Sequence, residues 1–215
     1  MKALLAPLKK QPNLRHLIDE LESYWVEEQN RRLDFYNWVD PSMKAEFIDG
    51  EIIVHSPVIK MHNVITKNLL IILEHFNIIN ELGFLGVEKI MCRFTRNDYE
   101  PDLCFFLHEN HPSFRSDQTI FPVPDFIIEI LSKSTEDRDR GVKFQDYQMH
   151  GVKEYWIIDP DAETIEQYIN QGDHFQLTTK NADGNIDCFV FKDFSIPTKV
   201  VFNNKKVFDF INSLK

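Results

Sequence analysis

The chain has 215 residues, of which 43% are hydrophobic and 27% charged, and its formal net charge at pH 7 is −10. The hydrophobic and charged fractions are typical of an ordinary globular chain. The missing basic excess excludes a protein that holds nucleic acid mainly through non-specific phosphate contacts over its whole surface. Any nucleic-acid surface must therefore be a local patch or depend on a bound cation.

The three cysteines and the N-terminus both indicate a cytoplasmic protein. Cys92, Cys104 and Cys188 form no CxxC pair, so we expect reduced, mostly buried thiols. Residues 1–12 lack the apolar stretch of a secretory signal, and no apolar run is long enough to span a bilayer. We expect no contact with a membrane.

The first elements in chain order are a helix and a hairpin. Residues 14–33 carry apolar side chains at helical spacing with acidic residues between them, which predicts an amphipathic helix. Asp49-Gly50 lies between two runs rich in β-forming residues and predicts a tight hairpin turn. We assign residues 1–40 to a helical extension and residues 41–215 to one domain.

The rest of the chain alternates helices and strands. We expect a helix over residues 62–77, strands at 87–94, 103–107 and 126–131, and a loop at 112–119. A second helix begins at Ser134 or Thr135 and ends near His150 before Gly151. A hairpin follows at 154–169 around Pro160-Asp161, then strands at 174–179 and 189–191 and a helix at 207–214. This order predicts one α+β domain preceded by a helical extension.

Glu129 lies in a strand where every neighbour is apolar, Phe126 to Leu131. A carboxylate buried in such a strand is costly unless it is paired or bound to a metal. A buried salt bridge would satisfy it structurally, so this residue alone leaves both explanations open.

Asp102 directly precedes a second apolar strand, residues 103–107. If the two strands pair, the carboxylates of Asp102 and Glu129 meet at one place on the sheet and repel each other. A hard cation relieves that repulsion, because Mg²⁺ is held by one or two carboxylates and waters. The alternative for Asp102 is a turn cap without a ligand.

Four stretches of the chain, taken together, resemble the Uma-type family of restriction endonucleases within the PD-(D/E)-x-K nuclease superfamily. They are residues 46–51 (EFIDGE), Pro101-Asp102, residues 124–132 (PDFIIEILS) and the run that holds Asp139, Lys143 and Tyr147 and ends with residues 151–160 (GVKEYWIIDP). The resemblance implies an α+β fold with a mixed sheet flanked by helices, a restriction-endonuclease-like core and a phosphodiester site that uses Mg²⁺ or Mn²⁺. Asp102 would match the motif's first aspartate and Glu129 its second acid, and both would bind the metal.

The chain departs from the superfamily pattern at Leu131, where the motif has a lysine. Such a lysine positions the attacking water and balances developing charge. Lys133 lies on the same strand face as Glu129, and Lys143 lies on the following helix with Arg140 and Tyr147 on the same face. We expect Lys143 to replace the missing lysine, and an ordinary surface lysine is the alternative.

The resemblance and the spacing add further candidates near the site. Glu46 matches the superfamily's more variable acid, although here it lies beside a hairpin. His62 begins a helix next to that hairpin, where it either faces the metal or caps the helix. Three aromatic residues, Tyr155, Trp156 and Tyr168, could stack on bases, but core packing is their commoner use in a strand hairpin.

These observations favour a Mg²⁺-dependent endonuclease that hydrolyses DNA, with RNA as the alternative substrate. The competing hypothesis is a catalytically inactive nuclease fold that binds nucleic acid or protein. Leu131 and the acidic net charge favour the inactive module, whereas the two carboxylates favour the enzyme. A homodimer fits an enzyme that cuts both strands.

Overall fold

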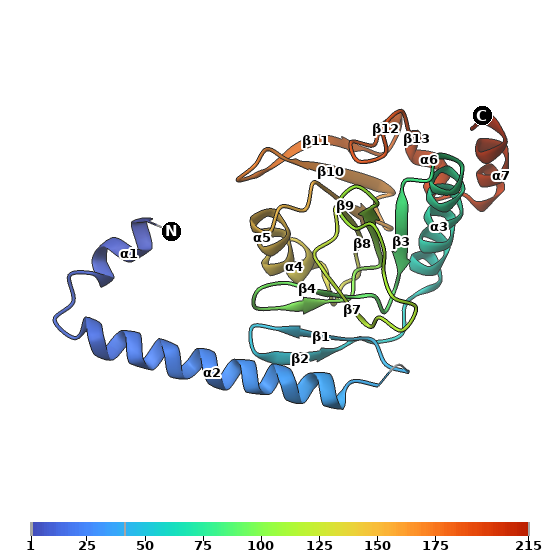
Figure 1. Cartoon of the computed structure of the whole chain (residues 1–215). Helices are drawn as coiled ribbons and strands as arrows, with labels where there is room; N and C mark the ends of the chain where they lie inside the picture. The colour runs from blue at the N-terminus through green and yellow to red at the C-terminus, as the bar shows by residue number, and fades with distance from the viewer. Residues whose placement is uncertain (1, 41, 215) are drawn as a thin grey trace.

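The computed structural model describes residues 2–40 and 42–214. Its strands form a five-stranded, a six-stranded and a two-stranded sheet, with helices packed around them (Figure 1). Both larger sheets are mixed. In the first, β4 (Met91–Arg93) runs parallel to β7 (Ile120–Phe121), and in the second, β8 (Phe126–Ile130) runs parallel to β9 (Glu154–Asp159). The predicted α+β class is confirmed.

Two helices begin the chain, α1 (Lys2–Leu8) and α2 (Leu14–Trp38). In Figure 1, α2 runs below the five-stranded sheet and its N-terminal half projects beyond the strands. The predicted helix is present and longer than expected, but its side chains Ile18, Leu21 and Tyr24 are exposed. Among the described helices, none combines the length and the apolar character needed to cross a membrane.

The five-stranded sheet begins with the predicted hairpin of β1 (Ala45–Ile48) and β2 (Glu51–Val54). Asp49 and Gly50 form its turn with φ values of 51° and 84°, which is why this sequence makes a tight reversal. The strand order is β2-β1-β5-β4-β7, so the short β5 (Asp98–Tyr99) lies between β1 and β4.

The six-stranded sheet has the order β11-β10-β9-β8-β6-β3. Every residue of β8 is buried, because β8 lies between β6 (Leu103–Leu107) and β9 in the middle of the sheet. The outer strands are β10 (Thr164–Asn170), β11 (Phe175–Asn181) and β3 (Gly83–Val87). The prediction of a central buried strand at Glu129 is confirmed.

Each face of the six-stranded sheet packs against different elements. One face is covered by α3 (Lys60–Asn80), α6 (Thr198–Val201) and α7 (Asn204–Ser213), which pack on alternate residues of β8 such as Ile128. The other face meets α5 (Val142–Met149) and the five-stranded sheet in a second cluster. Since side chains alternate along a strand, Glu129 points toward this second cluster.

Several other predictions are confirmed with small changes in their bounds. The helix expected at 62–77 is α3, the hairpin around Pro160-Asp161 is β9 and β10, the strand at 174–179 is β11 and the C-terminal helix is α7. The three cysteines are free and buried.

The single strand predicted over residues 87–94 is wrong. The chain instead leaves β3 at Val87 and enters β4 at Met91, in the other sheet. Glu88 and Lys89 both adopt φ of 43°, a left-handed conformation that interrupts a strand. Neither residue type favours such a turn, so the sequence carries little signal for the break.

The single helix predicted from Ser134 to His150 is also wrong. It is divided into α4 (Glu136–Asp139) and α5 (Val142–Met149) at Gly141. A Cβ atom placed on Gly141 would lie 2.5 Å from the carbonyl oxygen of Asp137, and real Cβ atoms essentially never make so short a contact. The absent side chain therefore permits the break that separates the two helices.

Residues 189–191 do not form the predicted strand, and the nearby strands are β12 (Asn185–Asp187) and β13 (Ser195–Pro197). The backbone N–H groups of Phe189 and Val190 donate to Oε2 of Glu154 at 2.9 and 2.8 Å, so the chain curls around this carboxylate. Oε2 also accepts from the Cys188 thiol, and Oε1 accepts from Trp156 and Gln167.

Candidate functional site

Asp102 and Glu129 lie next to each other where β6 begins. Leu103 pairs with Ile128 in the antiparallel β6–β8 ladder, which puts the preceding Asp102 opposite Glu129. The backbone N–H of Asp102 lies 3.4 Å from Glu129 Oε2, and the N–H of Ile130 donates to Asp102 Oδ2 at 2.9 Å. Both carboxylates are buried on the side of the sheet that faces α5.

Lys143 reaches Glu129 from α5, the helix that we predicted to supply it. Its ammonium lies 3.0 Å from Glu129 Oε1, 2.9 Å from Glu46 Oε1 and 3.4 Å from Asp139 Oδ1. Only 2% of the Lys143 side chain is exposed, which contradicts the alternative of an ordinary surface lysine. The hydroxyl of Tyr147, one turn further along α5, donates to Glu129 Oε1 at 2.8 Å.

Asp102 has two more partners from other elements. The Lys44 ammonium, just before β1, lies 2.8 Å from Asp102 Oδ1. His62 Nε2, in the first turn of α3, lies 3.0 Å from Asp102 Oδ2, so this histidine contacts the site rather than capping its helix. The catalytic role of His62 stays a prediction.

Glu46 enters the site from β1, a strand, and not from an early helix. Its Oε2 lies 2.9 Å from His55 Nε2, and its Oε1 accepts from the backbone N–H of Glu100 at 2.9 Å. Glu100 in turn accepts from the N–H of Ala45. These bonds fix Glu46 beside Lys143 without any exposure to solvent.

The pKa values of the carboxyl groups separate strongly. Burial raises the pKa of Glu129 to about 8 against the opposing charge of Lys143, and the nearby Asp139 carboxylate adds to the rise. Burial also opposes ionisation of Glu46, but Lys143 and His55 outweigh it and lower its pKa to about 2. For Asp102, the hydrogen bond from His62 and the charge of Lys44 overcome burial and lower the pKa. Of these three groups, Glu129 is thus the one that retains a proton near neutral pH.

The cluster carries more negative than positive groups. Four buried carboxyl groups, of Glu46, Asp102, Glu129 and Asp139, face the two ammonium groups of Lys44 and Lys143. When all four are ionised and the histidines are neutral, the excess is two negative charges. Oδ1 of Asp139 has no hydrogen-bond partner, and the only donor within reach of Glu129 Oε2 in the described chain is the distant N–H of Asp102.

The donor set suits a hard divalent cation. In the part of the chain that the structure describes, no three His, Cys, Asp or Glu side chains converge to hold a metal ion by themselves. Mg²⁺, however, takes one or two carboxylates and completes its shell with waters or substrate phosphates. Asp102 and the poorly satisfied Oε2 of Glu129 supply that number, and a dication would balance the excess charge of the cluster.

Lys44 and Asp139 also belong to the site, although neither was predicted to have a role there. Lys44 precedes Glu46 by two residues, so strand alternation gave a signal that both reach the same side. Asp139 precedes Lys143 by four residues, the spacing of an ion pair on a helix, and it keeps that contact across the break at Gly141.

Other residues considered in the sequence lie away from the site. Arg140 was expected on the same face as Lys143, but its guanidinium binds Glu166 instead. Lys133 is exposed. Tyr155 and Trp156 are fully buried core residues and are not available to stack on bases, and Tyr168 packs against Phe144.

Three comparisons with known proteins bear on this arrangement. The family Uma2, described as "Putative restriction endonuclease", matches residues 25–197. An uncharacterised protein of Synechocystis sp. is 31% identical over 141 residues, which are 64% of this chain and 78% of that protein. A solved structure from Anabaena variabilis, described as a "putative nuclease belonging to DUF820", superposes with a TM-score of 0.67 at 22% identity, over 78% of this chain and 94% of that one. The fold is therefore nuclease-like.

Proposed function

The chain belongs to the Uma2 family, and from that membership we propose that it is a Mg²⁺-dependent endonuclease that hydrolyses phosphodiester bonds in DNA. The observation that carries the proposal is the pair of buried carboxylates on neighbouring strands, with Lys143 reaching Glu129 from the next helix. Lys143 takes the place that Leu131 leaves in the nuclease motif. We propose the cytoplasm as the location, which the three free cysteines support.

Asp102 and Glu129 would hold the metal ion, Mg²⁺ or Mn²⁺. Such an ion polarises a phosphoryl oxygen and lowers the pKa of a bound water. The pKa of Glu129, raised to about 8 by burial, means that this group binds a proton in the absence of a cation and releases it when one binds. Metal affinity should therefore increase as the pH rises toward 8.

Lys143 and Lys44 have the charge and position to act on a phosphate. The carboxylates of Glu129 and Glu46 raise the pKa of Lys143 despite its burial, so its ammonium stays charged. A fixed cation beside a phosphodiester stabilises the negative charge that develops on the phosphate oxygens in the transition state. Tyr147 keeps Glu129 oriented by donating to Oε1.

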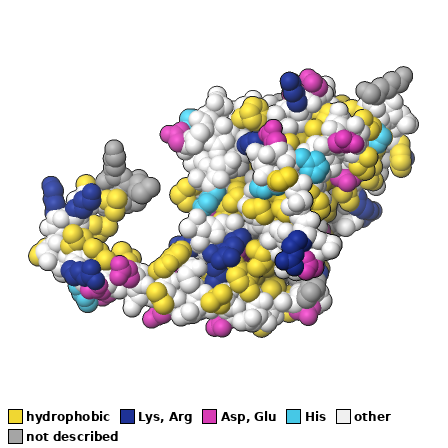
Figure 2. All heavy atoms as spheres, viewed as in Figure 1, with side chains coloured by type: hydrophobic (Ala, Val, Ile, Leu, Met, Phe, Trp, Pro, Cys, Tyr) yellow, Lys and Arg dark blue, Asp and Glu magenta, His cyan; other side chains and the backbone are white. Residues whose placement is uncertain are grey.

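Local basic side chains support DNA as the substrate despite the net charge of −10. Figure 2 shows Lys and Arg side chains gathered on one face over the five-stranded sheet, while acidic side chains are scattered. Arg31 on α2 and Arg93 on β4 are exposed, and 39% of the Arg96 side chain is accessible beside its partners Glu28 and Asp49. A phosphate backbone lying across this face would gain contacts that depend on salt concentration.

The test combines metal binding with cleavage. We expect Mn²⁺ or Mg²⁺ to raise the melting temperature of the wild type and to support nicking of a supercoiled plasmid, and Asp102→Asn to lose both effects. Asp137→Asn, an exposed aspartate on α4, is the matched control and should retain both. If the wild type binds the plasmid but does not cut it, and neither metal raises its melting temperature, the result would instead support the inactive binding module.

A further inference from the structure

One side of α2 carries a continuous row of residues spaced alternately four and three apart. Glu28, Arg32 and Phe35 in this row are buried against the body, where Arg32 binds Asp98 and Glu28 binds Arg96. The same row continues toward the N-terminus with four apolar residues, Trp25, Leu21, Ile18 and Leu14. Trp25 is 42%, Leu21 63% and Ile18 37% exposed, and Leu14 is half-buried.

We call the part of α2 from Leu14 to Trp25 the overhang. It projects beyond the strands in Figure 1, and most of it precedes residue 25, where the match to the Uma2 family begins. The overhang is therefore an addition to the nuclease-like body. The same side of α2 packs on that body from Glu28 onward and is largely exposed in the overhang.

We propose that the overhang pairs antiparallel with the overhang of a second copy of this chain, forming a homodimer. Alternating spacings of four and three residues are those of the seam between two supercoiled helices. A two-fold axis midway between Ile18 and Leu21 sets Leu14 against the second copy's Trp25 and Ile18 against its Leu21. The three exposed side chains of the row, Ile18, Leu21 and Trp25, are then buried in the seam together with the half-buried Leu14.

Charge complementarity selects this partner and this direction. Arg15 and Glu22 each follow a row residue directly, so both flank the seam. In the antiparallel register Arg15 lies beside the second copy's Glu22, and the symmetry produces this pair twice. In a parallel pairing these two positions of the two copies lie on opposite sides of the seam, so neither Arg15–Glu22 pair is made. Arg15 also pairs with Asp19 of its own helix, and a guanidinium has enough donors for both carboxylates.

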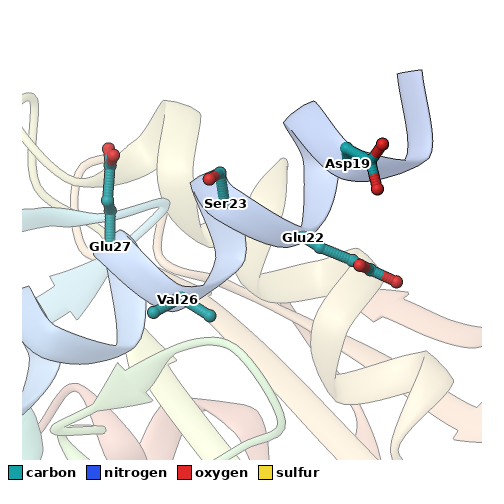
Figure 3. Close-up of a pocket in the computed structure, with 5 residues that line it drawn as sticks. All are labelled: Asp19, Glu22, Ser23, Val26 and Glu27. Atoms are coloured by element: carbon teal, nitrogen blue, oxygen red, sulfur yellow. The ribbon is translucent and has the colours of Figure 1, made fainter. Parts of the chain in front are cut away.

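The remaining charges of the overhang disfavour other occupants. Between Leu14 and Glu27 the helix has four acidic residues and one arginine, which repels nucleic acid and anionic lipid. Figure 3 shows a hollow along this stretch lined by α2 alone, and three of its five residues are acidic: Asp19, Glu22, Ser23, Val26 and Glu27. Val26 is 57% exposed and lies off the row, so it serves as a control position.

The first test is the mass of the protein in solution. We expect light scattering at tens of micromolar to give twice the 25.5 kDa of one chain. Leu21→Glu should give a monomer, and Val26→Glu, an equally apolar and exposed position on the same helix, should leave the dimer unchanged. Circular dichroism checks that both variants remain helical.

The second test addresses register. Arg15→Glu should weaken the dimer about tenfold, since two attractive pairs become repulsive, and adding Glu22→Arg should restore it. A mixture of Leu14→Cys and Trp25→Cys proteins should form a covalent dimer on mild oxidation, whereas neither protein alone should do so. A monomeric wild type, a dimer that survives Leu21→Glu, or a monomer that instead binds neutral phosphatidylcholine vesicles through α2 would each overturn the proposal.

Discussion

Replacing Glu129 with glutamine tests whether this buried carboxyl group holds a proton in the folded protein. Glutamine has the same shape, and its oxygen still accepts the bonds that Lys143 and Tyr147 make to Oε1. Burial raises the pKa of Glu129 to about 8 from a reference value of 4.5. At neutral pH the wild type therefore keeps this proton when folded and loses it when it unfolds.

The sign and size of the effect follow from these two pKa values. Because the folded-state pKa is raised, the stability linked to this proton is fully present below about pH 4.5 and is lost as the pH rises toward 8. Each pH unit in that window is worth at most about 1.4 kcal/mol, so the wild type loses up to roughly 3 kcal/mol between about pH 5 and 7.5. Glutamine does not titrate. We expect Glu129→Gln to melt close to the wild type near pH 5 and higher than it near pH 8, by on the order of 5–10 °C.

Thermal melts of wild type and variant across this pH range measure the difference directly. Glu46→Gln is the matched control. Lys143 and His55 lower the pKa of Glu46 to about 2, so this carboxyl group is ionised in the folded wild type at neutral pH. Breaking that buried pair should lower stability at neutral pH by about 3–5 kcal/mol. If Glu129→Gln melts below the wild type near pH 8 by as much as Glu46→Gln does, Glu129 is a charged partner of Lys143 and the reasoning fails.

Two further substitutions test the charges around the site. Lys143→Met removes the ammonium that contacts three buried carboxyl groups. It should abolish cleavage and lower the free energy of unfolding by about 3–5 kcal/mol, measured by urea titration; unchanged stability would contradict the buried ion pairs. Arg32→Lys should lower the free energy of unfolding by about 2 kcal/mol in the same titration. Lysine cannot reproduce the paired bonds to Asp98 and the bonds to three backbone carbonyls. A change within experimental error would show that those bonds contribute little.

The parts of the fold that could be predicted depend on local chemistry. Asp49-Gly50 forms a tight turn because of the conformations open to those two residues. The buried strand at Glu129 was predictable because its neighbours are apolar. Both of these inferences need only a few adjacent residues, whereas Lys143 was chosen from the resemblance to the nuclease superfamily together with its helical spacing from Tyr147.

The parts that could not be predicted depend on distant partners. Phe189 and Val190 read as a strand, yet the carboxylate of Glu154, more than thirty residues earlier, captures their N–H groups. Likewise, Lys44 has an ordinary position before β1 until the fold brings Asp102 to within 2.8 Å of it. In both cases the decisive contact lies far away in sequence.

The bonds of Glu154 also constrain the order in which a nascent chain can fold. Three of its five donors come from residues 188–190, which leave the ribosome well after β8, β9 and β10 have been synthesised. Until those residues arrive, completing the sheet would bury a carboxylate that lacks most of its donors, at a cost of several kcal/mol. The segment at residues 188–190 thus stabilises the sheet only late in synthesis. A chain shortened before Cys188 keeps every candidate catalytic residue but lacks three of the donors that stabilise Glu154 in the sheet.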